Sequence, residues 1–220
     1  MIAIDGPAGA GKSTTAKAIA QQLGLRYLDT GAMYRAMAWF ARDAGLTDPA
    51  EIAAAFASVR LELTSDIPPR VRVGESDITD AIRTAAVSDA ASQLSAHGAV
   101  RQELLRRQRE MIAAGGVVLE GRDATTVIAP NADLKVYMTA SLEERAQRRT
   151  REYAAKGTDA DFSAVRADIL QRDFRDTTRD ESPLKVAPDA VIVETGGKSV
   201  EAVVDEIVAL VNAMTDASSR

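Results

Sequence analysis

Short runs of consecutive apolar residues recur along the chain, separated by stretches with helical spacing. Such uninterrupted runs are typical of strands buried on both faces, as in a parallel sheet. The first run, at 2–4, leads into a glycine-rich loop and then a helical stretch over 12–23 that ends before Gly24. Further runs lie at 26–28, 116–119, 134–138 and 190–193. Because strands that alternate with helices favour a parallel sheet, the pattern predicts an α/β fold.

Two segments depart from this pattern. Residues 60–63 and 71–73 alternate apolar and polar side chains, which is the period of half-exposed strands. They predict a small antiparallel insert outside the main sheet. Helical spacing covers most of the remaining chain, and we expect helices at 32–44, 82–96, 99–113, 141–180 and 200–214.

Four loops directly follow predicted strands, at Gly6, Thr30, Gly121 and Thr139. Parallel strands end at one edge of a sheet, and ligands in α/β sheets bind beyond the carboxyl ends of the strands. We therefore expect these loops to contribute to one binding site.

The glycine-rich loop carries the most specific motif of the chain. Residues 6–13 match G-x-x-x-x-G-K-S/T in full, between a predicted strand and a predicted helix. Backbone amides and the helix N-terminus would bind phosphate oxygens. Lys12 would reach the β- and γ-phosphates, and the Ser13 hydroxyl would hold Mg²⁺. The predicted ATP-binding residues are Gly6, Pro7, Ala8, Gly9, Ala10, Gly11, Lys12, Ser13 and Thr14.

Arginine is concentrated in two stretches. Residues 141–180 hold eight arginines, one lysine and nine carboxylates. This near-neutral balance indicates solvated helices with ion pairs for most of these arginines, and phosphate contacts for a few. Residues 101–109 hold four arginines and one glutamate. Taken alone, that stretch is typical of an ordinary exposed helix face.

Composition limits the class of partner. The 220 residues carry a net charge of −5, so a globally basic nucleic-acid surface is not expected. No run approaches the ~18 apolar residues that span a bilayer, and Asp5 interrupts the first run, so neither a membrane span nor a signal peptide is expected. The absence of cysteine fits a cytoplasmic location. The single histidine, His97, lies beside Gly98 at a helix break, where we expect a structural or exposed side chain.

Four further motifs resemble those of bacterial cytidylate kinases (CMP/dCMP kinases), a family of P-loop nucleoside monophosphate kinases. The motifs are DTGAMYR at 29–35, VRQELLRRQR at 100–109, EGRD at 120–123 and RDFRDTTR at 172–179. Together with the glycine-rich loop they extend from Met1 to about Pro188, in order and with matching spacing.

The resemblance implies an architecture. It implies a three-layer P-loop kinase fold with a five-stranded parallel sheet, a small antiparallel insert in the monophosphate-binding region and a helical lid. The single kinase chain, 1–220, would divide into a core of about 1–31, 114–140 and 184–220, a monophosphate-binding region of about 32–113 and a lid of about 141–183.

The resemblance also implies an activity. A monomer would transfer a phosphoryl group from ATP, with Mg²⁺, to CMP or dCMP, without nucleic-acid or membrane partners. The implied catalytic residues are Lys12, Arg122 and Arg172. The implied CMP-binding residues are Thr30, Tyr34, Arg35, Ser92, Arg101, Arg122, Asp123, Asp176 and Arg179. Among these, Arg35 and Arg122 would hold the acceptor phosphate, Asp176 would meet the sugar, and Ser92, Arg101, Asp123 and Arg179 would surround the cytosine edge.

Three positions depart from the family pattern. Thr125 stands where the family usually has glycine, so the structure has to decide the backbone path of that loop. Glu120 replaces the commoner aspartate, close to the expected Mg²⁺. Thr30 replaces a frequent serine and keeps the hydroxyl.

Three other functions would use some of the same features. Another small-molecule kinase of this fold, such as an adenylate, guanylate or shikimate kinase, would share the glycine-rich loop. A GTPase switch would need an N-K-x-D segment, which the sequence lacks. Nucleic-acid binding would use the arginines, but the net charge and the neutral 141–180 stretch oppose it.

Overall fold

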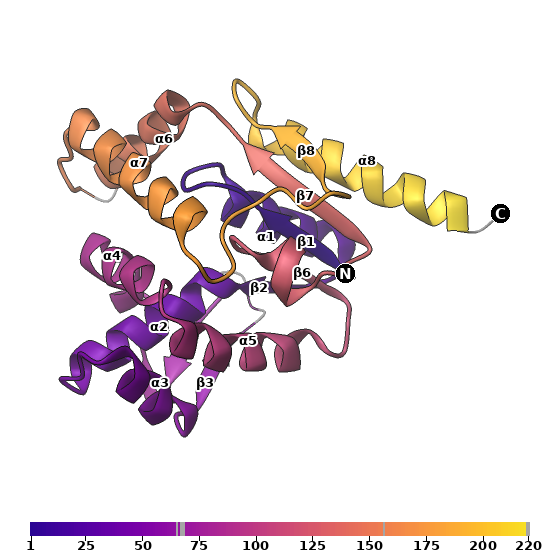
Figure 1. Ribbon diagram of the computed structural model, residues 1–220. Helices are drawn as coiled ribbons and strands as arrows, with labels where there is room; N and C mark the ends of the chain where they lie inside the picture. The colour runs from indigo at the N-terminus through magenta and orange to yellow at the C-terminus, as the bar shows by residue number, and fades with distance from the viewer. Residues whose placement is uncertain (65, 67–68, 156, 219–220) are drawn as a thin grey trace.

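A five-stranded parallel sheet forms the centre of the computed structural model, which describes residues 1–64, 66, 69–155 and 157–218 (Figure 1). The strand order is β2-β6-β1-β7-β8, and all neighbouring pairs are parallel. The strands are β1 (Ile2–Asp5), β2 (Arg26–Asp29), β6 (Val117–Glu120), β7 (Leu134–Thr139) and β8 (Val191–Glu194). Each coincides with one of the five apolar runs, within a residue or so at either end.

The helices follow the expected order, with additions. They are α1 (Lys12–Leu23), α2 (Thr30–Asp43), α3 (Pro49–Ala57), α4 (Ala85–Leu94), α5 (Gly98–Ile112), α6 (Leu142–Ala155), α7 (Phe162–Thr178) and α8 (Val200–Ser218). The helix predicted at 82–96 is instead a 3-10 turn, Ala81–Arg83, followed by α4, because Thr84 is extended and caps α4 with its hydroxyl. Helix α3 and a π-helical turn, Ala124–Ile128, had not been expected.

Among the described residues, no helix combines the length and the apolar character needed to cross a membrane.

The two faces of the sheet are covered by different helices. Ile2 and Ile4 point into a core shared with α1 and α8, while Ala3 between them points into a core shared with α2 and α5. This alternation follows from the period of two along a strand. Helices α6 and α7 pack on each other as a hairpin at the upper left of Figure 1, opposite α2 and α4. The sheet thus lies between two helical layers.

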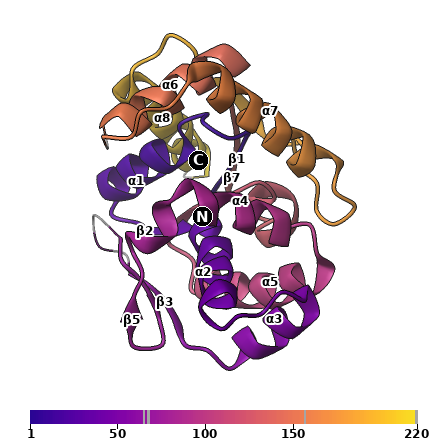
Figure 2. The same cartoon turned by 90° about the vertical axis from the view of Figure 1, so that its left-hand side faces the viewer.

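A separate three-stranded antiparallel sheet confirms the expected insert. It comprises β3 (Leu61–Leu63), β4 (Val71–Val73) and β5 (Ser76–Asp77), and Figure 2 shows it beside α2 and α3. Leu61, Val71 and Val73 are buried in the same core as α2. Strand β5 was not predicted, because two polar residues show no alternation.

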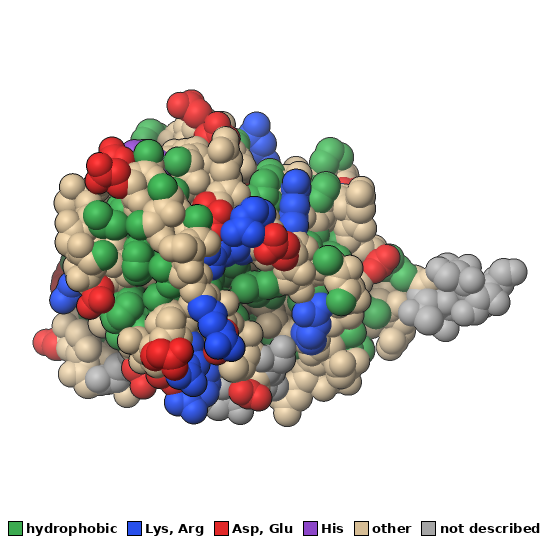
Figure 3. Space-filling view, turned by 90° about the horizontal axis from the view of Figure 1, so that it is seen from below, with side chains coloured by type: hydrophobic (Ala, Val, Ile, Leu, Met, Phe, Trp, Pro, Cys, Tyr) green, Lys and Arg blue, Asp and Glu red, His purple; other side chains and the backbone are tan. Residues whose placement is uncertain are grey.

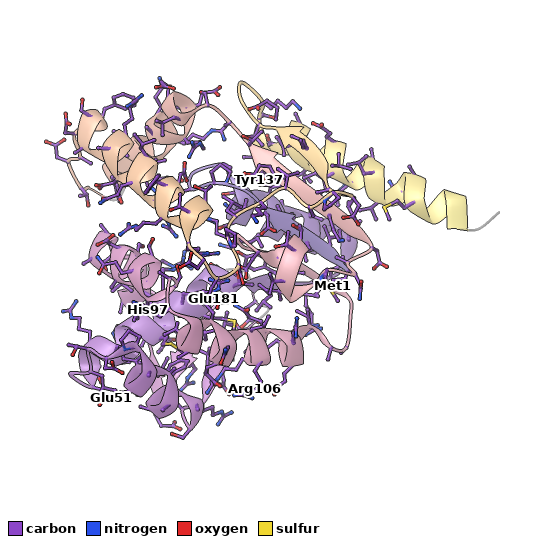
Figure 4. All side chains as sticks on the ribbon, viewed as in Figure 1. Met1, Glu51, His97, Arg106, Tyr137 and Glu181 are labelled. Atoms are coloured by element: carbon purple, nitrogen blue, oxygen red, sulfur yellow. The ribbon has the colours of Figure 1, made fainter. Side chains whose placement is uncertain are left out.

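The arginines of α5 correct the expectation of an ordinary exposed face. Arg106 and Arg109 are exposed, and Figure 4 shows Arg106 on the outer side of the helix. Arg107, in contrast, is only 8% exposed. It donates hydrogen bonds to the carbonyl oxygens of Phe56, Ala57 and Val59, just where α3 ends. Arg107 therefore satisfies the last carbonyl groups of α3 and fixes that helix on α5.

We expect Arg107→Met to lower the free energy of unfolding by about 3 kcal/mol, because three carbonyl groups and the Glu103 carboxylate would lose a buried cationic partner. Arg106→Met removes an exposed ion-paired arginine one residue away and should cost less than about 1 kcal/mol. Urea unfolding of both variants measures the difference. Equal losses would contradict a special role for Arg107.

Candidate active site

A cleft with a volume of about 450 Å³ lies where the strands end. Its walls come from the glycine-rich loop, α2, α4, α5, the turn after β6, and the α6–α7 hairpin, and Figure 4 shows side chains converging between α7 and α4. The lining includes most of the predicted site residues: Ala8, Gly9, Gly11, Lys12, Ser13, Thr14, Thr30, Tyr34, Arg35, Ser92, Arg101, Arg122, Asp123, Arg172, Asp176 and Arg179. Gly6, Pro7 and Ala10 belong to the loop but do not line the cleft. Residues from five separate stretches of the sequence thus share one site.

Glycine is required at the start of the loop. Gly6 has a φ of +149°, and a Cβ there would lie 2.1 Å from the carbonyl oxygen of Met138 on β7. Gly11 has a φ of +93° and precedes the first residue of α1. These positions let the chain turn sharply from β1 into α1, so that the helix N-terminus faces the cleft.

Lys12 lies at this helix N-terminus and is 5% exposed. Its Nζ donates to the carbonyl oxygen of Pro7, at 2.8 Å. Burial lowers the pKa of Lys12 to about 7, and the nearby cations Arg122 and Arg172 act in the same direction against Glu120. A bound anion at this point would favour the charged ammonium group.

The hydroxyl groups of Ser13 and Tyr27 meet the Glu120 carboxylate close to Lys12. The Ser13 hydroxyl donates to Glu120 Oε1 at 2.6 Å, and the Tyr27 hydroxyl reaches the same oxygen at 3.3 Å. A hydroxyl and a carboxylate are ligand types that Mg²⁺ accepts, directly or through water. Among the described residues no group of three or more His, Cys, Asp or Glu side chains is placed to hold a metal ion. The longer side chain of Glu120 still reaches the Ser13 hydroxyl.

A partly buried ion pair from the hairpin contacts the glycine-rich loop. Asp173 of α7 accepts the amide N–H of Ala8 at 3.1 Å, and Arg145 of α6 donates to the carbonyl oxygen of Ala8 at 2.9 Å. Arg145 and Asp173 also contact each other at 2.5 Å. Both polar groups of one loop residue are therefore bound by the hairpin. No local pattern in the sequence indicates this contact, although Asp173 lies inside the RDFRDTTR motif.

Two arginines expected at the acceptor phosphate are each held by a carboxylate. Asp29 caps α2 through the amide of Ala32 and binds Arg35 Nη2 at 2.8 Å. Burial raises the pKa of Asp29, but Arg35 and the helix amide outweigh it, so the pKa is lowered overall. Asp176 accepts from Arg122 Nε at 2.8 Å. The two cations are oriented before any ligand binds.

The same cleft extends into a polar pocket against α4 and α5. Arg101 and Asp123 form a buried ion pair, and Arg101 also donates to the carbonyl oxygen of Ser95 at 3.1 Å. The Arg101 guanidinium lies 5.5 Å from the centre of the Tyr34 ring. The Ser92 hydroxyl is buried and finds no partner in the described part of the chain. This pocket offers donors, an acceptor and an aromatic face to a planar polar ligand.

Arg179 approaches the same pocket from the end of α7. It donates to the carbonyl oxygen of Ser182 through Nε and Nη2, at 3.0 and 2.7 Å, and to the Ser95 hydroxyl at 3.3 Å. Its position is thus set by the residues after α7 and by the end of α4.

The arginines of the hairpin differ from the sequence expectation. Arg149 does form a local ion pair, with Glu152, and Arg166 of α7 pairs with Glu143 of α6 within the hairpin. Most of the others form hydrogen bonds outside the hairpin or line the cleft. Arg145 binds Ala8, Arg148 binds Thr195, Arg175 binds Asp89 and Arg179 binds Ser95. Arg172 lines the cleft. Helical spacing could not reveal these contacts, because their partners are distant in sequence.

The structure answers the question raised by Thr125. Ser182 is the one non-glycine residue with positive φ in the described part of the chain, so Thr125, which lies in the π-helical turn, does not adopt the positive φ that would favour glycine. Its hydroxyl donates to Asp5 Oδ2 at 2.6 Å. His97 is exposed, as expected.

Known proteins resemble this chain over most of its length. The family model described as cytidylate kinase matches residues 2–213. A cytidylate kinase of Symbiobacterium thermophilum is 46% identical over 211 residues, which cover 94% of this chain and 93% of the relative. A bifunctional pantoate ligase/cytidylate kinase of Synechocystis sp. is 46% identical over 216 residues, which cover 96% of this chain and 42% of the relative. The chain thus spans less than half the length of that bifunctional protein.

Solved structures support the fold. The structure of a gluconokinase from Sinorhizobium meliloti 1021 superimposes with a TM-score of 0.52 and 15% identity, covering 99% of this chain and 94% of that one. At this identity the likeness concerns the fold alone, and it confirms the expected P-loop kinase architecture. The match of the family model over nearly all of the sequence, together with the high coverage by the Symbiobacterium relative, shows that the chain belongs to the cytidylate kinase family.

Proposed function

We propose that this chain transfers the γ-phosphoryl group of MgATP to CMP or dCMP. The observation that carries the proposal is the single cleft that joins the glycine-rich loop around Lys12 to the pocket of Arg101 and Asp123. The loop end supplies amides and cations for a triphosphate. The pocket end supplies paired donors and acceptors for a nucleobase.

The pocket suits cytosine. Cytosine presents an amino donor beside ring acceptors, so its recognition needs a carboxylate or hydroxyl acceptor together with cationic donors. Asp123 and the unpartnered Ser92 hydroxyl supply the first, and Arg101 and Arg179 supply the second. The Tyr34 ring lies at the side of this pocket. A base with the opposite donor pattern would leave these buried groups unpaired.

The transfer needs no strong general base. A phosphate monoester has a second pKa near 6, so the attacking oxygen is largely ionised at neutral pH. Arg35 and Arg122 would hold the acceptor phosphate, and Lys12 and Arg172 would neutralise charge on the transferred group. The Ser13 hydroxyl, which is hydrogen-bonded to Glu120, would hold Mg²⁺. The ion would neutralise further charge when it is bound with the nucleotide.

The division of the chain into core, monophosphate-binding region and lid is part of the proposal. Residues 141–183 contain the α6–α7 hairpin, and closure of such a lid would exclude water from the transfer. Basic and acidic side chains are intermingled on the face seen in Figure 3, which does not favour a nucleic-acid backbone as partner. The monomeric state and the cytoplasmic location stay predictions of the sequence.

A panel of nucleoside monophosphates with MgATP tests the function. ADP release should be fastest with CMP and dCMP, weaker with UMP, and absent with AMP, with GMP and with shikimate as a non-nucleotide control. Activity with AMP alone would overturn the proposal.

We expect MgATP binding to be accompanied by proton uptake at pH 8. The pKa of Lys12 is about 7 in the free protein, so the amine is mostly neutral at pH 8, and the bound phosphates would raise this pKa and protonate it. At pH 6 the amine is already protonated, and the uptake should vanish. Calorimetry in two buffers of different ionisation enthalpy measures the proton count. Lys12→Arg, whose side chain is always charged, should show no uptake at either pH.

We expect Arg179→Ala to reduce the preference for CMP over UMP by about 10-fold or more, because one cationic donor to the base is lost. The affinity for MgATP should change little. Competition assays with both monophosphates measure the ratio, with Arg166→Ala as the control, because Arg166 lies on α7, has a 42% exposed side chain and does not line the cleft. An unchanged CMP:UMP ratio would show that Arg179 does not read the base.

A further inference from the structure

The carboxylate of Asp5 is fully buried at the end of the central strand β1. It accepts three hydrogen bonds, from the amides of Ala124 and Thr125 at 2.9 and 2.7 Å and from the Thr125 hydroxyl at 2.6 Å. All three donors belong to the first turn of the π-helix Ala124–Ile128. Asp5 thus acts as a tertiary cap for a turn that is more than a hundred residues away in sequence.

The capped turn directly follows the residues expected to hold the acceptor nucleotide. Arg122 and Asp123 immediately precede Ala124, and neither has a side-chain contact with Asp5 among the hydrogen bonds and ion pairs of the described residues. Asp5 itself immediately precedes Gly6, the first residue of the glycine-rich loop. The same carboxylate therefore connects the loop that would bind the phosphate donor with the turn that would bind the acceptor.

Burying this carboxylate is unfavourable by itself. Burial raises the pKa of Asp5 to about 6, and the hydrogen bonds from Thr125 and Ala124 oppose that rise. An apolar residue at this position would avoid the penalty. The three donors compensate it only when the turn adopts the observed conformation, so the contact specifies the position of the turn.

We propose that Asp5 and the Thr125 hydroxyl are positioning residues for the acceptor nucleotide, acting through the backbone that carries Arg122 and Asp123. The proposal rests on the proposed transfer to CMP. Phosphoryl transfer depends on alignment of the two phosphates, and a displacement of about 1 Å can cost about 100-fold in rate. Loss of the contact should therefore weaken the handling of CMP more than that of ATP.

The adjacent threonine provides a matched control. The Thr126 hydroxyl is also buried, but it has no hydrogen-bond partner in the described structure. Thr125→Val and Thr126→Val make the same chemical change one residue apart, and Thr125→Ser keeps the hydroxyl. The two valine variants thus separate the contact with Asp5 from a general effect of valine in this turn.

The experiment measures kcat, the KM for CMP and the KM for ATP, and CMP binding without ATP by calorimetry. Thr125→Val should lower kcat/KM for CMP by about 10-fold, with the KM for ATP changed less than about twofold, because a hydrogen bond to a charged group is lost. Thr125→Ser and Thr126→Val should stay close to the unchanged protein. Asp5→Asn, which turns an acceptor into a donor opposite N–H groups, should cause a loss of about 100-fold.

Several outcomes would overturn the inference. If Thr125→Val and Thr126→Val had equal kinetics, or if Thr125→Val lowered only the melting temperature, the contact would be structural. If Asp5→Asn failed to fold, the comparison of Thr125→Val with Thr126→Val and Thr125→Ser would by itself decide whether the contact positions the acceptor. If the unchanged protein did not phosphorylate CMP at all, the proposed function would fail instead, and that result is separate from any difference among the variants.

Discussion

Positive charge is crowded into the cleft before any anionic substrate binds, and much of the site is arranged around this repulsion. Burial lowers the pKa of both Lys12 and Arg172, and the nearby charge of Arg122 lowers both further, so the cations near the glycine-rich loop oppose one another. Asp176 and Glu120 act against this effect. A substrate that carries several phosphate charges would relieve the repulsion directly. The free protein is therefore electrostatically prepared for phosphates, at a cost to its own stability.

The compensating carboxylates also fix geometry. Asp29 holds Arg35, Asp176 holds Arg122, and Asp123 holds Arg101. A buried ion pair contributes little net stability, since both groups lose hydration, but breaking it leaves an uncompensated charge. The value of these pairs lies in holding the guanidinium groups in place before binding. Less of the binding free energy is then used to order the side chains.

The order of the parallel strands brings the two halves of the site together. Strands β1 and β6 are neighbours, with Ile4 opposite Glu120, so the glycine-rich loop and the turn that carries Arg122 leave the sheet side by side. The amide of Gly121 donates to the carbonyl oxygen of Ile4, and Asp5 then holds the next turn. The expected donor and acceptor sites are thus linked through neighbouring strands at the centre of the parallel sheet.

The sequence by itself determined the five sheet strands, the antiparallel insert and the phosphate-binding loop, because apolar runs, alternation and a contiguous motif are local signals. The resemblance located the residues that line the cleft. Only the tertiary structure decided which arginine does what: Arg107 closes α3, Arg145 holds Ala8, and Arg101 pairs with Asp123. It also revealed the contact between Asp5 and Thr125. Helical spacing predicts which side chains share a face of a helix. The hydrogen-bond partners of these residues, however, lie between 22 and 137 residues away in sequence, so only folding brings them into contact.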